Sequence, residues 1–242
     1  MRNFPYKILI PSYQRAGRAS TIDFLRGGVY GCEDIIVSTQ TEDDYQAYKK
    51  AYAGKATIIY REGNSVGDNR NTLLEWAQKN GVSFAVMLDD DIRSFRFMNG
   101  KRITTPEQAH ELFLRCFRVA SGEGSPLWGC YPCDNRLSMK PKVRCTLLTG
   151  TLLGFLDTTL RFDNRYRIKE DYELSLRLMR QGRKVLRFDS FGVTAQHKTE
   201  GGCFADWGNQ GRYADMLVEQ YPELCEIDKK KKHKEIKLKK LI

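Results

Sequence analysis

The chain has 242 residues, of which 41% are hydrophobic and 11% aromatic, so it can bury a sizeable core and is not a disordered chain. Its 40 Lys and Arg residues exceed its 30 Asp and Glu residues, which gives a net charge of +10 and favours anionic partners. It has no apolar run near the roughly 18 residues of a membrane span, and its first residues lack a signal sequence. We therefore expect a globular protein of the cytoplasm.

Short apolar segments alternate with amphipathic segments over the first 90 residues. Strands are predicted at 7–13, 35–38, 57–60 and 84–88, and helices at 20–26, 43–52 and 66–80. A βαβαβαβ order predicts a mostly parallel α/β sheet that is flanked by helices.

The second half of the sequence is less regular. A helix is predicted at 106–121, a stretch rich in Gly, Pro and Cys at 122–141, strands near 144–155, 184–188 and 191–196, and a helix at 170–181. Neither an internal repeat nor a linker separates the halves, so we expect one domain over residues 1–227 and a tail over residues 228–242.

Three cysteines in this half could form part of a zinc site. Cys130 and Cys133 make a single CxxC pair and Cys145 follows, but no second pair matches them. Because one pair is a weak signal, we expect buried free cysteines.

The predicted tail contains eight lysines. Nucleic-acid phosphate is the commonest partner of such a segment, and an anionic membrane is the second, with Ile236, Leu238, Leu241 and Ile242 as the apolar grip. A solvated tail without a specific partner is equally compatible with the pattern.

An acidic cluster follows the apolar strand at 84–88. Asp89, Asp90 and Asp91 are adjacent, and ligands of parallel sheets bind at the carboxyl ends of strands. A hard cation that prefers oxygen ligands would relieve the repulsion between these carboxylates. The alternative is an acidic turn that caps the next helix.

Four motifs occur in the order seen in GT-A glycosyltransferases, which the chain resembles over roughly residues 5–200. They are Ile10–Arg15, Gly67–Asn71, Asp89–Asp91 and Glu170–Asp171. Within that superfamily the chain is most similar to the TET-associated glycosyltransferases, a phage-rich group to which the glycosylation of hydroxymethylated pyrimidines in DNA is ascribed. The resemblance implies a single GT-A (Rossmann-like) domain that acts in the cytoplasm of a phage-infected host.

The resemblance also implies a metal-dependent inverting transfer of a hexose from a nucleotide diphosphate sugar, UDP-glucose by default, to 5-hydroxymethylcytosine in DNA. Mn²⁺ or Mg²⁺ would be held by Asp91, by Asp89 and by His197. Asp89 could instead accept a hydrogen bond from the donor ribose, with Asp90 turned toward the sugar or supporting the turn. A lone histidine such as His197 is also often structural.

The resemblance places further donor contacts in three segments. Pro11, Tyr13 and Arg15 would meet the nucleotide, Asp68 and Arg70 the nucleotide or the diphosphate, and Lys198 the diphosphate from a closing loop. Arg15 could equally be an ordinary surface arginine, and Asp68 a helix-capping acid.

Glu170 and Asp171 open a predicted helix, where the resemblance places the general base that deprotonates the acceptor hydroxyl. Asp171 is the first choice and Glu170 the second. Capping of the helix is the alternative role for this acidic pair.

The acceptor is the least defined part of this interpretation. Aromatic and basic residues mix in irregular segments, as an extruded base and its phosphates would require; they are Trp128, Tyr131, Phe204, Trp207, Arg136, Lys140, Lys142 and Arg144. A protein or glycan acceptor, a nucleotidyltransferase and a non-catalytic nucleic-acid-binding module are the alternatives.

Overall fold

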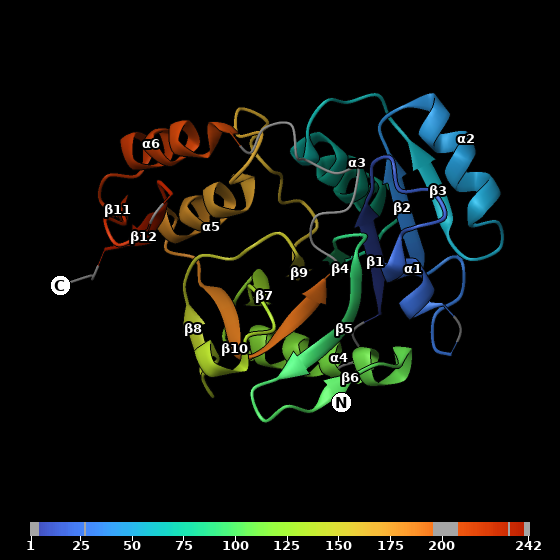
Figure 1. The fold of residues 1–242 in the computed structure, drawn as a ribbon, viewed down its shortest axis with the longest axis horizontal. Helices are drawn as coiled ribbons and strands as arrows, with labels where there is room; N and C mark the ends of the chain where they lie inside the picture. Colours follow the sequence, from blue (N-terminus) through green and yellow to red (C-terminus); the bar gives the residue numbers. More distant parts are fainter. Residues whose placement is uncertain (1–4, 27, 196–207, 232, 240–242) are drawn as a thin grey trace.

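The computed structural model describes residues 5–26, 28–195, 208–231 and 233–239. A ten-stranded sheet runs through the molecule with helices on both faces, and a two-stranded sheet lies at one end beside α6 (Figure 1). The elements are β1 (Tyr6–Pro11), α1 (Ser20–Leu25), β2 (Ile35–Thr39), α2 (Glu42–Ala51), β3 (Thr57–Tyr60), α3 (Val66–Lys79), β4 (Phe84–Leu88), β5 (Ile92–Phe97), β6 (Arg102–Ile103), α4 (Pro106–Gly122), β7 (Leu127–Tyr131), the 3-10 helix η1 (Arg136–Ser138), β8 (Val143–Cys145), β9 (Leu152–Phe155), α5 (Glu170–Arg180), β10 (Val185–Ala195), α6 (Gln210–Gln220), β11 (Cys225–Ile227) and β12 (Ile236–Leu238).

The strands of the large sheet are ordered β3-β2-β1-β4-β9-β7-β10-β5-β6, with β8 also paired to β10. Strands β1 to β4 are parallel to one another, and β7 is parallel to β10. Between these two groups, β9 runs antiparallel to both β4 and β7. The prediction of a mostly parallel α/β sheet flanked by helices is confirmed.

Side chains of the central strands alternate between two apolar cores. On β1, Ile8 and Ile10 pack with α1, α2 and α4 on one face, whereas Leu9 packs with α3 and α5 on the other. On β4, Val86 faces the first core and Met87 the second. These strands lack polar alternation because both of their faces are covered by helices.

The second half of the chain departs from the prediction in several places. The stretch at 122–141 contains the buried strand β7, and the single strand expected at 144–155 is two strands, β8 and β9. The strands expected at 184–188 and 191–196 are one strand, β10, and β5 and β6 follow the acidic cluster without having been predicted.

One cross-strand contact explains the glycine inside β9. Trp128 on β7 is paired with Gly154 on β9, and a Cβ atom on Gly154 would lie 1.9 Å from the indole ring. A glycine inside a strand lowers its apparent strand propensity. Here the glycine is required by a buried tryptophan that lies 26 residues away in the sequence.

The cysteine prediction holds only in part. Cys130 is buried, but Cys133 is half-buried and Cys145 is exposed on β8. The six cysteines of the described residues are free thiols, and no group of three or more His, Cys, Asp or Glu side chains within these residues could hold a metal ion.

The end of the chain forms a small hairpin next to α5 and α6. Strand β12 pairs antiparallel with β11, and Ile236 is buried in a third apolar core with Tyr213 and Leu217 of α6. The boundary expected at residue 228 falls between the two strands of this hairpin. Since Ile236 is buried, it is not available to grip a membrane, and no helix in the described residues is long and apolar enough to cross one.

An ion pair fastens this hairpin to the start of α5. Lys169 Nζ lies 2.6 Å from Glu235 Oε1, and the lysine side chain is only 8% exposed. Lys169 has a left-handed backbone with φ of 66° and directly precedes Glu170. The C-terminal hairpin therefore helps to set the position at which α5 begins.

Replacing Glu235 by Gln is expected to lower the free energy of unfolding by about 1–3 kcal/mol, because a largely buried ammonium loses its anion. Urea unfolding followed by circular dichroism measures the change. Glu226→Gln is the matched control, since Glu226 and its partner Lys237 are each 48% exposed. Equal, small effects of both substitutions would show that the buried pair does not fasten the hairpin.

Candidate functional site

The carboxyl ends of β1 and β4 lie side by side, and the predicted motifs follow them directly. The two strands are paired from Tyr6 with Phe84 to Leu9 with Met87, so the segment after Pro11 lies beside Asp89–Asp91. The chain before β9 joins them, because Asp89 N donates to Thr151 O at 3.1 Å. The edge of the sheet thus brings together three segments that are far apart in the sequence.

Asp90 is the buried member of the acidic cluster. Its carboxylate accepts hydrogen bonds from Ser12 Oγ and from the Arg15 guanidinium, and Thr21 N donates to its carbonyl oxygen at 3.2 Å. Burial raises the pKa of Asp90 to about 6, although Arg15 and Ser12 oppose the rise. Asp90 therefore supports the turn, the second of the roles considered for it.

Asp89 and Asp91 retain access to solvent, with side chains 34% and 17% exposed. Asp89 Oδ1 accepts a hydrogen bond from Arg70 Nη2 at 3.1 Å, and Asp91 Oδ2 lies 3.4 Å from Arg15 Nη1. Two carboxylates suit a hard cation that takes its remaining ligands from water and phosphate oxygens. His197 and Lys198 lie outside the described residues.

Arg70 joins the acidic cluster to Glu170, the second choice for the base. This α3 residue donates to Glu170 Oε1 as well as to Asp89, and its side chain is only 5% exposed. Burial lowers the pKa of Arg70, but the carboxylates of Glu170, Asp89 and Asp171 outweigh it and raise the pKa. One buried cation thus pairs with two carboxylates, those of Asp89 and Glu170, and also feels the charge of Asp171.

Glu170 and Asp171 have different surroundings although they are adjacent. Glu170 is buried against Arg70, whereas Asp171 is half-buried. Asp171 Oδ2 accepts from Gly150 N at 2.7 Å, and Oδ1 accepts from Tyr172 N at 2.8 Å. Burial raises the pKa of both carboxyls, and Arg70 opposes the rise in each case. The Tyr172 contact is a helix-start interaction, so part of the capping role exists alongside any role in catalysis.

Gly150 is required by the approach of Arg70. A Cβ atom at this position would lie 2.2 Å from both Nη atoms of the guanidinium, which is held in place by two carboxylates. Gly150→Ala is therefore expected to displace Arg70 and to cost about 1–3 kcal/mol of stability together with most of the activity. Thermal unfolding and turnover measure the two effects.

Gly122→Ala is the matched control, because a Cβ atom there meets nothing within 4 Å. If Gly150→Ala were as active and as stable as Gly122→Ala, the proposed rigidity of Arg70 would be wrong.

The remaining predicted donor residues lie at the edges of this network. Pro11 is the buried last residue of β1, and Tyr13 is half-buried, with its hydroxyl accepting from Gln14 Nε2 at 3.1 Å. Arg15 is buried against Asp90 and Asp91 and is not an ordinary surface arginine. Its contact with the donor nucleotide stays a prediction.

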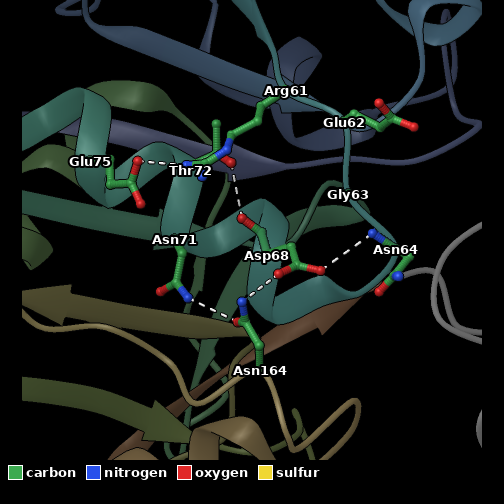
Figure 2. Close-up of a pocket in the computed structure, with 9 residues that line it drawn as sticks. All are labelled: Arg61, Glu62, Gly63, Asn64, Asp68, Asn71, Thr72, Glu75 and Asn164. Carbon is green, nitrogen blue, oxygen red and sulfur yellow. Dashed lines mark hydrogen bonds and ion pairs between the residues drawn. The ribbon is translucent and has the colours of Figure 1, made fainter.

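Asp68 is an acid in the first turn of α3, whose N-cap is Ser65. Ser65 Oγ accepts from Asp68 N at 3.0 Å and donates to its carboxylate at 2.8 Å, and Asn164 also donates to that carboxylate. Figure 2 shows Asp68 and its contact with Asn164 in a polar pocket of about 180 Å³ formed by α3, the segment before it and Asn164. Asp68 therefore makes its hydrogen bonds outside the Arg70 network, and its contact with the donor remains a prediction.

Three residues whose side chains form hydrogen bonds with the backbone of the site were not predicted. Thr21 Oγ1 donates to Asp89 O at 2.6 Å, Tyr48 OH accepts from Arg15 N at 3.1 Å, and Asn69 Nδ2 donates to Ser12 O at 3.1 Å. Asn69 is inside a quoted motif, which was the one available signal. Thr21 and Tyr48 lie on helices whose sequence pattern indicates only core packing.

Comparison with known proteins gives one family and a set of related folds. A family model described as TET-Associated Glycosyltransferase matches residues 6–203. A search of curated protein sequences finds no match. Among solved structures, S. aureus TarS 1-349 aligns with a TM-score of 0.53 and 14% identity over 78% of this chain and 59% of TarS 1-349. The chain thus spans less than two thirds of that relative.

Two further solved structures are among the matches. Mannose-1-phosphate geranyltransferase from Thermus thermophilus has a TM-score of 0.50 and 12% identity over 78% of this chain and 75% of its own. A putative nucleotide-diphospho-sugar transferase from Desulfovibrio desulfuricans has a TM-score of 0.48 and 13% identity over 89% and 97%. At such identities the likeness to TarS and to the Thermus protein shows the fold alone.

Proposed function

Because the chain belongs to the TET-associated glycosyltransferase family, whose model covers residues 6–203, we propose that it transfers a hexose from UDP-glucose to 5-hydroxymethylcytosine in DNA. The transfer inverts the anomeric centre and requires Mn²⁺ or Mg²⁺. A glycosyltransferase that acts on phage DNA works in the cytoplasm of the infected host.

The buried Arg70 bridge is the observation that carries the proposal. It joins Asp89, which faces solvent beside Asp91, to the acidic pair that opens α5. Donor and acceptor must meet between a cation-binding group and a base in this reaction. Asp89 and Glu170, the neighbour of the base Asp171, are held by one buried arginine here, which supports a catalytic role over that of a non-catalytic binding module.

On the donor side, Asp89 and Asp91 would hold the cation, with His197 as a third ligand. The described residues include no three-ligand cluster, so the donor diphosphate would supply oxygens as well. When bound by these carboxylates, a cation would supply neutralisation of the charge that develops on the departing nucleotide. Pro11 and Tyr13 border the nucleotide, and Arg15 orients Asp90 and Asp91 while presenting positive charge to the donor. Lys198 would reach the diphosphate.

On the acceptor side, Asp171 takes the proton of the hydroxymethyl group. The acceptor oxygen forms a bond to the anomeric carbon as the bond from that carbon to the diphosphate oxygen breaks, and the nucleotide diphosphate leaves from the opposite face. Burial raises the pKa of Asp171, which brings a carboxylate closer to the range in which a general base works well. Glu170, which is ion-paired to Arg70, acts as a positioning residue and is the second choice for the base.

The experiment is an incubation of the protein with Mn²⁺, a panel of nucleotide sugars, and DNA that contains either cytosine or 5-hydroxymethylcytosine. Mass spectrometry of the nucleosides then reports any added hexose. We expect a hexose on hydroxymethylated DNA only, and only with the cation present.

Other outcomes separate the alternatives. Metal-dependent hydrolysis of one nucleotide sugar without transfer to DNA would point to a protein or glycan acceptor. Release of pyrophosphate from a nucleoside triphosphate would indicate a nucleotidyltransferase. Salt-dependent DNA binding without either activity, and unchanged in Asp91→Ala, would indicate a non-catalytic binding module.

A further inference from the structure

Two segments at one edge of the large sheet contain basic residues but no acidic residues. Segments 92–106 and 135–156 contain no Asp or Glu. Their basic residues are Arg93, Arg96, Lys101, Arg102, Arg136, Lys140, Lys142 and Arg144. All of them are exposed except Arg96, which is half-buried.

The fold brings the two segments to one surface, which we call the basic edge and define by these eight residues. Strand β10 pairs with β8 and also with β5, and β5 pairs with β6; the four strands are neighbours in Figure 1. Arg136 Nε donates to Met98 O at 3.4 Å, and a Cβ atom on Gly100 would lie 3.2 Å from Arg136 Nη1. The segment of η1 is therefore in contact with the β5–β6 turn.

Two acidic residues near the basic edge are already paired with other side chains. Asp189 is fully buried and is paired with both Arg144 and Arg187, the latter at 2.7 Å. Asp134 accepts from Thr194 Oγ1 at 2.9 Å. The positive charges of Lys101, Lys140 and Lys142 have no counterpart in these two segments, so the basic edge attracts anions from solution.

The basic edge is connected to the proposed base by a short piece of chain. Gly150, whose amide donates to Asp171, is the sixth residue after Arg144 of β8. Six residues span at most about 20 Å, which is the length of about six base pairs of duplex. Phosphates held on the basic edge therefore lie a few nucleotides from a base presented to Asp171.

We propose that the basic edge is the docking surface for the phosphate backbone of duplex DNA, on either side of the nucleotide that is modified. This inference rests on the proposed function, which it deepens by naming the surface that holds the acceptor. Four neighbouring strands about 4.8 Å apart make a broad surface, and a broad field of cations suits a duplex. An anionic membrane favours one amphipathic helix with its apolar face exposed, which the basic edge does not contain.

The test is a charge reversal, Lys140→Glu with Lys142→Glu, at two exposed positions. Lys49→Glu with Lys50→Glu is the matched control, because both lysines are exposed on α2, which packs beside β3 at the other end of the sheet.

Fluorescence anisotropy with a labelled duplex of about 20 base pairs, long enough to cover the basic edge and the site, measures binding over a range of salt concentrations. We expect about tenfold weaker binding for the variant with Lys140 and Lys142 reversed, and a salt slope reduced by about two, since two phosphate contacts are lost. The α2 variant should match the unmodified protein.

Transfer to a trinucleotide that contains 5-hydroxymethylcytosine is measured in parallel, because it is too short to reach the basic edge. Unchanged transfer to the trinucleotide with impaired transfer to the duplex supports the docking surface. Equal effects of both variants on duplex binding, or none from either, overturn it. Binding to vesicles of anionic lipid that depends on Lys140 and Lys142, without binding to DNA, also overturns it. If the unmodified protein transfers nothing to either substrate, the proposed function fails while the binding comparison still decides the surface.

Discussion

Asp171→Asn is expected to lower turnover by about 10²–10⁴-fold, the range that general base catalysis supplies, and to leave the affinity for UDP-glucose nearly unchanged. An amide cannot accept the proton of the acceptor hydroxyl. Its oxygen can still accept a hydrogen bond from Gly150 N, which donates to Asp171 at 2.7 Å, so the backbone around the site should hold its shape. Turnover at saturating donor and calorimetric titration with UDP-glucose measure the two quantities.

The control for this variant is Asp215→Asn, which makes the same chemical change at an exposed ion pair on α6. It should retain full turnover. A loss of donor affinity in Asp171→Asn with normal turnover at saturation would contradict the base assignment. Normal turnover in Asp171→Asn with loss of activity in Glu170→Gln would transfer the role to Glu170.

Arg70→Met is expected to lower the free energy of unfolding by about 3–5 kcal/mol, because removal of one partner from a buried ion pair leaves an uncompensated charge. Glu170 is buried and Asp171 is half-buried beside it, so the carboxylates would repel one another without the guanidinium. We also expect turnover to be lost, since Asp89 and α5 would no longer be held together. Urea unfolding followed by circular dichroism gives the stability.

Two further variants make the Arg70 result interpretable. Arg115→Met removes an arginine that is 73% exposed on α4 and should change stability by less than about 0.5 kcal/mol. The double variant Arg70→Met with Glu170→Gln should recover part of the lost stability but not the turnover, because the buried negative charge has gone while the bridge to Asp89 has not been restored. A cost of Arg70→Met as small as that of Arg115→Met would refute the bridge.

The first half of the fold could be predicted from sequence because its signals are local. Each strand from β1 to β4 is a short apolar run, and each helix between them has a helical apolar pattern, so windows of about ten residues are sufficient. The second half could not be predicted in the same detail. Strand β10 has a register shift against β7 between Phe188 and Gly192, and its other neighbour changes there from β8 to β5. Such pairing depends on strands that are distant in the sequence.

The candidate site shows the same division. The sequence placed Asp89–Asp91 and the Glu170–Asp171 pair at strand and helix ends, where the structure has them. It could not show that Asp90 points inward to Ser12 and Arg15, because three adjacent aspartates look alike until the turn is formed. Nor could it show that Arg70 contacts Asp89 and Glu170, since the partners of this buried arginine lie 19 and 100 residues away.

These long separations have a kinetic consequence. Assembly of the site joins Arg70 to Glu170 across 100 residues, whereas β1, β2 and β3 pair through short helical crossovers. Closing long loops carries an entropic cost before any contact rewards it. During refolding we therefore expect the parallel half of the sheet to form early. Enzymatic activity should return with the slowest phase, after most of the secondary structure is already in place.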